Sequence, residues 1–62
     1  MNIAKEIEYC REREQAERAA ADATADRAAH DAHFRLAERY ADKAWSLSEQ
    51  ADELARIADG PR

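Results

Sequence analysis

Apolar, small and histidine side chains recur along the second half of the chain at spacings that alternate between three and four. They are His30, His33, Ala37, Tyr40, Ala44, Leu47, Ala51, Leu54 and Ala58. This alternation is the repeat of a helix that lies along another helix. The pattern predicts a long helix over residues 25–59 that packs against a helical partner and stops at Gly60 and Pro61.

The first third of the chain predicts a second, shorter helix, for which Asn2 is a good N-cap. One stripe of this helix consists of Ile3, Ile7 and Cys10, and then meets Glu14 and Glu17. A second stripe, on another side, consists of Tyr9, Ala16, Ala20 and Ala23. We therefore expect a helix over residues 2–23 that contacts two neighbours along its length, with Glu14 and Arg18 at a favourable spacing for an ion pair.

The boundary between the two helices carries only a weak signal, because no Gly or Pro occurs between Asn2 and Asp59 and alanine favours helix. Thr24 is the candidate N-cap of the second helix, with Asp26 in its first turn. The pattern favours an all-α, two-helix antiparallel hairpin that turns near Thr24 over one uninterrupted helix of coiled-coil type.

A looser pattern of individual residues runs from Tyr9 to Ala44. It comprises Tyr9, Arg11, Arg13, Glu17-Arg18, Ala23-Thr24, His33, Leu36-Ala37-Glu38-Arg39-Tyr40 and Ala44. This order resembles a group of short, uncharacterised bacterial helical-hairpin proteins, in which Thr-Asp-Pro ends one helix and places Pro at the start of the next. The resemblance implies a hairpin and brings no activity or ligand. Because this chain has Thr24-Ala25-Asp26 there, we expect Asp26→Pro combined with Ala25→Asp to be tolerated.

The composition limits how much such a chain can bury. Sixteen of its 62 residues are alanine, and the larger apolar residues are too few to fill a freestanding globule. The single cysteine rules out a disulfide framework, so self-association or a partner protein is the expected source of further stability. We expect a single hairpin domain over residues 1–62 that assembles into a homodimeric four-helix bundle.

Two features of the longer helix suggest where a second chain binds. Folded back, it extends roughly ten residues beyond the shorter helix, at about 1.5 Å per residue, so the apolar side chains near its end lack cover. Trp45 lies off the main repeat beside Phe34, Ala41 and Ser48, which widens the apolar face. The interface is predicted to contain Tyr40, Ala44, Trp45, Leu47, Ala51, Leu54 and Ile57.

Charge and hydropathy argue against several other kinds of partner. Ten basic and fourteen acidic residues give a net charge of −4 without a block of like charges, which disfavours binding to nucleic acid. No secretory signal and no apolar run long enough to cross a bilayer occur, so a cytoplasmic protein with a reduced Cys10 is expected.

His30 and His33 are the candidate metal ligands, since residues three apart on a helix can chelate a metal. A hairpin that turns near Thr24 places His33 opposite about Gln15 and leaves Cys10 several turns away. We therefore favour structural histidines over metal ligands, and replacing the pair by Ala and Leu is expected to leave the fold intact. Cys10 is interpreted as a core residue.

No catalytic, cofactor or metal site is predicted, and the chain is not expected to be an enzyme. The favoured function is a self-associating helical interaction or adaptor module. Two alternatives stay open, namely an accessory helical subunit of a larger complex with an unknown protein partner, and a weak metal-binding bundle that uses both histidines.

Overall fold

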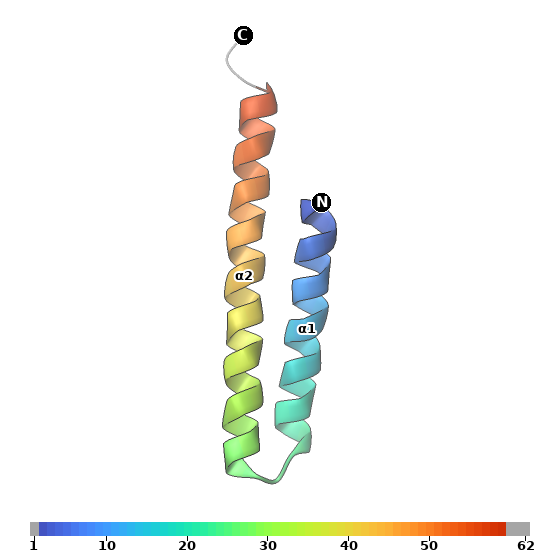
Figure 1. Cartoon of the computed structure of the whole chain (residues 1–62), viewed down its shortest axis with the longest axis vertical. Helices are drawn as coiled ribbons and strands as arrows, with labels where there is room; N and C mark the ends of the chain where they lie inside the picture. The colour runs from blue at the N-terminus through green and yellow to red at the C-terminus, as the bar shows by residue number, and fades with distance from the viewer. Residues whose placement is uncertain (1, 60–62) are drawn as a thin grey trace.

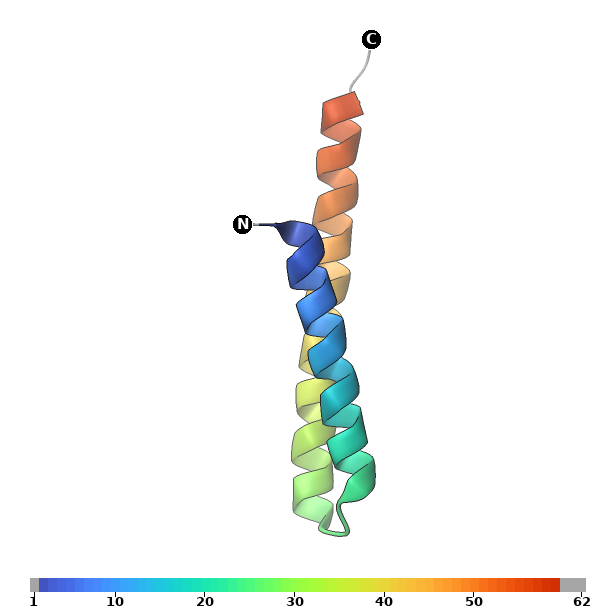
Figure 2. The same ribbon diagram turned by 90° about the vertical axis from the view of Figure 1, so that its right-hand side faces the viewer.

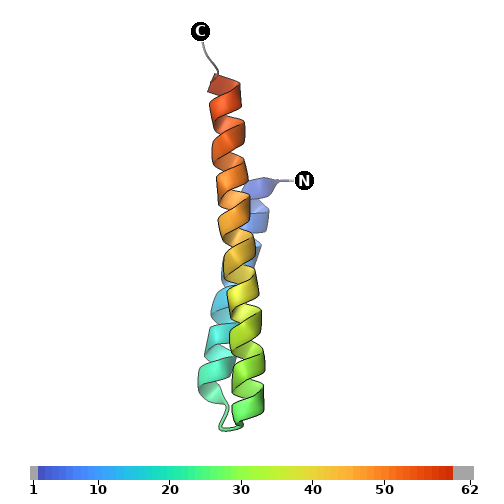
Figure 3. The same ribbon diagram turned by 90° about the vertical axis from the view of Figure 1, so that its left-hand side faces the viewer.

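Two α-helices pack side by side in an antiparallel hairpin in the computed structural model, which describes residues 2–59 (Figure 1). Helix α1 spans Ile3–Ala23 and helix α2 spans Arg27–Asp59. The hairpin measures 57 × 15 × 14 Å, and views from two sides show that the helices stay adjacent along the length of α1 (Figures 2 and 3). The expected two-helix antiparallel hairpin is thus confirmed, whereas the predicted stop at Gly60 and Pro61 lies outside the described residues.

Helix α1 begins at the cap that the sequence predicts. The Asn2 side chain accepts a hydrogen bond of 2.9 Å from the amide of Ala4, and the Asn2 carbonyl accepts one of 3.1 Å from the amide of Glu6. The Glu6 carboxylate also lies in the first turn, where the helix dipole favours negative charge. Further along, Arg18 and Glu14 form the expected ion pair, at 2.8 Å.

The turn between the helices differs from the sequence-based prediction. Thr24 is the C-cap residue of α1, with φ −97° and ψ 140°, and its hydroxyl accepts a hydrogen bond of 3.2 Å from the amide of Asp26. Asp26 is the N-cap of α2, because its Oδ1 accepts 3.0 Å from the amide of Ala28. The prediction that Thr24 caps α2 is therefore wrong, and α2 begins at Arg27 instead of residue 25.

The role of Asp26 argues against the expected tolerance of proline at this position. Proline would remove both the capping carboxylate and the amide that donates to Thr24. We expect Asp26→Ala to lower the free energy of unfolding by about 1 kcal/mol, the typical cost of losing an N-cap, measured by urea unfolding. Asp42→Ala, which removes the same charge from an exposed site within α2, is the matched control. Equal effects of the two changes would contradict the capping role.

The interior of the hairpin is thin. Its buried apolar residues are Cys10, Ala21, Ala37 and Ala44. Small side chains let the two helix backbones approach closely, but each removes little apolar surface from water. The second stripe predicted on α1 is mostly exposed, with Tyr9 at 57% and Ala16 and Ala23 also open to solvent. Within this chain α1 therefore has one neighbour, α2, and most of the larger apolar side chains remain outside the core.

Candidate interaction surfaces

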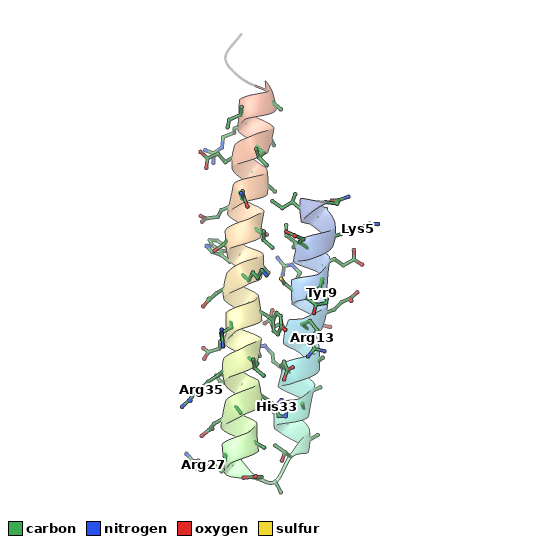
Figure 4. The ribbon with its side chains drawn as sticks, viewed as in Figure 1. Lys5, Tyr9, Arg13, Arg27, His33 and Arg35 are labelled. Carbon is green, nitrogen blue, oxygen red and sulfur yellow. The ribbon has the colours of Figure 1, made fainter. Side chains whose placement is uncertain are left out.

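A carboxylate lies at the centre of the hairpin, where the apolar stripe of α1 is interrupted. Glu17 is only 7% exposed, and it accepts hydrogen bonds of 2.6 Å from Arg13 and 2.6 Å from Nδ1 of His33. Figure 4 shows His33 directed from α2 toward α1. His33 thus faces Glu17, two residues from the expected Gln15. This site is not predicted from the sequence, although the alternating spacing from Cys10 through Glu17 to Ala21 places Glu17 in the seam.

Aromatic and cationic side chains surround this carboxylate on one side. The Arg13 guanidinium lies over the Tyr40 ring, 5.8 Å from its centroid, and the rings of Tyr9 and Tyr40 meet edge to face at 6.4 Å. Tyr40 chiefly, and then the Glu17 carboxylate, raise the pKa of Arg13 above its ordinary value. Arg13 therefore stays charged and balances the buried negative charge of Glu17.

His30 connects the start of α2 to the end of α1. Its Nδ1 lies 2.8 Å from the carbonyl oxygen of Ala21, and because a carbonyl only accepts, Nδ1 carries the proton. That carbonyl is in the last turn of α1, where no amide further along the helix is left to pair with it. The His30 ring also stacks on Phe34, with centroids 6.4 Å apart. Both histidines thus bond to α1, and among residues 2–59 no group of three or more His, Cys, Asp or Glu could hold a metal ion.

Two grooves mark the surface of the hairpin. One, of about 410 Å³, is lined by Leu36, Arg39, Tyr40 and Lys43. The other, of about 420 Å³, is lined by Thr24, Ala25, Asp26, Arg27, His30 and Asp31 around the turn. Cys10, the free thiol of the chain, lines neither of them and is 1% exposed, which fits its predicted place in the core.

The exposed apolar side chains of α2 include a line along one side of the helix, which we call the side stripe. It consists of Phe34, Ala41, Trp45 and Ser48. Phe34 is 42% exposed and Trp45 66% exposed, whereas Ala41 and Ser48 are partly covered. The charged side chains of Arg27 and Arg35 point away from α1 (Figure 4). Trp45 is the most exposed side chain of the side stripe, whereas the Phe34 ring already stacks on His30 and lies 5.7 Å from the Arg18 guanidinium of α1.

A second uncovered surface lies where α2 continues past the start of α1 (Figure 1). Helix α2 has 33 residues and α1 has 21. Because Glu17 faces His33 and the helices are antiparallel, Ile3 faces about Leu47. The repeat that packs against α1 then continues beyond it as Leu47, Ala51, Leu54 and Ala58, which we call the end seam. Leu54 is 54% exposed, and the adjacent Ile57 is 69% exposed.

The predicted interface residues divide between the inside and the outside of the hairpin. Ala44 is 3% exposed and belongs to the contact with α1, and Tyr40 is half-buried beside Tyr9. Leu47 and Ala51 are also half-buried. The residues left with large free apolar area are Trp45, Leu54 and Ile57.

Comparisons with protein-family models, with curated proteins and with solved structures give no match for this chain. Within residues 2–59, neither helix combines the length and the apolar character needed to cross a lipid bilayer.

Proposed function

We propose that this chain is a small helical interaction module that associates with a second copy of itself and has no catalytic activity. The observation that carries this proposal is the inverted distribution of apolar side chains. Among the residues that the structure describes, the buried apolar side chains belong to one cysteine and three alanines, whereas Trp45, Leu54 and Ile57 are more than half exposed. A 62-residue chain with so thin an interior gains little from its own core, and a second copy supplies the missing burial.

The side stripe supports a side-by-side arrangement of two hairpins. Joined through Trp45 and Phe34, two copies form a homodimeric four-helix bundle, in which α2 touches α1 of its own chain and a helix of the other chain. Tryptophan buries a large area and is enriched among the few residues that dominate interface energies. We place this assembly in the cytoplasm, where Cys10 stays reduced.

Trp45→Ala is expected to shift the protein from homodimer toward monomer, because it removes the largest side chain of the side stripe. Light scattering at several low protein concentrations measures the mass, and the wild-type indole should emit as a buried ring. Arg35→Ala, which truncates a side chain directed away from α1 (Figure 4), is the control and should leave the mass unchanged. A red-shifted, fully quenchable wild-type emission, or an alanine variant of unchanged mass, would rule out this interface.

An accessory subunit of a larger complex is the second candidate, favoured by the same exposed residues. A larger protein partner could cover Trp45 and the end of α2 in place of a second copy. The purified chain would then be a monomer that melts with poor cooperativity, whereas the self-associating module melts as a cooperative oligomer whose stability rises with concentration.

A metal-binding bundle is the third candidate, and the state of its histidines favours it. In both His30 and His33 the Nδ1 atom is engaged by an acceptor on α1, so Nε2 is the ring nitrogen that a metal would have to use. Metal-binding histidines are commonly oriented in this way. This candidate requires that zinc bind the purified protein stoichiometrically and raise its melting temperature.

A further inference from the structure

We propose that the end seam is a second self-association surface, which pairs in an antiparallel manner with the end seam of another copy and joins hairpins end to end. This contact is distinct from the side stripe, and it forms whether or not the hairpins also associate side by side. In this contact the uncovered end of α2 is covered by the same segment of a second chain.

The large and small side chains of one end seam fit those of a second, antiparallel end seam. Leucine and alanine alternate along it, at Leu47, Ala51, Leu54 and Ala58. In an antiparallel pair with Leu47 opposite Ala58 of the partner, Ala51 lies opposite the partner's Leu54. Each leucine then meets an alanine across the contact, so two large side chains never compete for the same space.

Charge is arranged to allow this pairing. The positions that flank the end seam are Ser48, Gln50, Ala55 and Ile57, none of which is charged. The charged residues of this segment, Glu49, Asp52, Glu53 and Arg56, all lie on the opposite side of the helix. Helices that lie against water on all sides usually carry charge at the flanking positions as well. The uncharged flanks therefore favour a helix that is covered here.

The length of the uncovered segment fits the same register. Helix α1 covers its own α2 as far as about Leu47, which lies opposite Ile3, the first residue of α1. In the proposed register, α2 of the other copy covers the segment from Leu47 to Ala58 and ends beside the start of α1. The negative end of one helix dipole then faces the positive end of another, which is favourable. Each α2 is then covered along most of its described length, and the two covering helices meet end to end at about Leu47.

The contact is small, because it involves about three turns of helix from each copy. It falls below the roughly 800 Å² per partner of a stable, specific interface, so we expect it to form at high protein concentration. Two copies joined in this way extend to about 95 Å, since the overlapping segments shorten the pair by about 1.5 Å per residue. A side-by-side bundle alone stays close to the 57 Å length of one hairpin.

Cysteine crosslinking tests the register directly. In a Cys10→Ala background, Leu47→Cys and Ala58→Cys variants are prepared separately, mixed and oxidised. The register predicts a disulfide between the two variants in the mixture. It predicts none within either variant alone, because equivalent positions lie eleven residues apart along the pair, or about 16 Å. Disulfides within each variant alone would indicate parallel pairing and overturn the proposal, as would the absence of any disulfide.

Small-angle scattering of the full chain at high concentration gives an independent readout. The maximum dimension should be about 95 Å, from the rise per residue given above, and Leu54→Glu should return it to the length of one hairpin. Arg56→Glu, on the charged outer side, is the matched control and should leave the dimension unchanged. A compact wild-type dimer that fails to crosslink overturns the end-to-end contact and leaves the side-by-side module intact. If light scattering at low concentration shows a monomer but the two cysteine variants still crosslink at high concentration, only the side-by-side bundle is overturned.

Discussion

Replacing His33 by leucine is expected to lower the free energy of unfolding by about 2 kcal/mol, even though it adds an apolar side chain to a helix seam. The reason is the buried partner, since the Glu17 carboxylate is 7% exposed and loses one of its two hydrogen bonds. A buried carboxylate that is left partly unpaired costs more than the apolar contact returns. This expectation replaces the sequence-based one, in which removal of the histidines is harmless.

The double variant, Glu17→Leu with His33→Leu, should recover most of the lost stability, because replacing both members of a buried polar pair by apolar residues is often neutral or better. Urea unfolding of the wild type, both single variants and the double variant completes the cycle. Glu14→Leu, which removes a carboxylate whose side chain is 22% exposed, is the control for a general effect of charge. Purely additive effects in the cycle would mean that Glu17 and His33 do not stabilise each other.

Ala37→Leu is the second change from which we expect a large effect. Ala37 is 0% exposed at the middle of the contact between α1 and α2. Helices packed through alanine have no room for a leucine, so the variant must push them apart or strain the new side chain, at a cost of about 1–3 kcal/mol. Urea unfolding measures this cost, and it should appear mainly in the midpoint of the transition.

The matched control is Ala32→Leu, the same change at an exposed site of α2, which should be close to neutral. Stabilisation by Ala37→Leu would contradict the close approach of the helices. It would show that the seam accepts a larger side chain without rearrangement.

Much of the fold could be predicted from the sequence because its signals are local. The alternating repeat of α2 and the cap at Asn2 depend on neighbours within one or two turns, and both are present as expected. The uncovered end of α2 follows from helix length alone. The ion pair between Glu14 and Arg18 is likewise set by spacing within one helix.

The sequence-based predictions that fail concern interactions that depend on the alignment of one helix with the other. The turn contains two candidate caps, Thr24 and Asp26, and the hydrogen bonds show that Asp26 is the N-cap of α2. A change of about two residues in the length of the turn moves the partner of His33 from Gln15 to Glu17. Glu17 was missed as a buried residue because a carboxylate, taken alone, predicts an exposed position.

The small side chains of the seam raise the question of how the hairpin selects one alignment among several. If the turn formed one helical turn earlier or later in the alanine-rich middle of the chain, α1 would slide along α2 by about one heptad while its alanines still met small residues. Glu17 would then face Asp26, which as a carboxylate has no donor, or Tyr40, which offers a hydroxyl in place of the imidazole N–H of His33. We therefore expect the pair Glu17 and His33 to contribute more to the choice of alignment than to stability. It distinguishes the observed alignment from slid ones that apolar burial alone would barely separate.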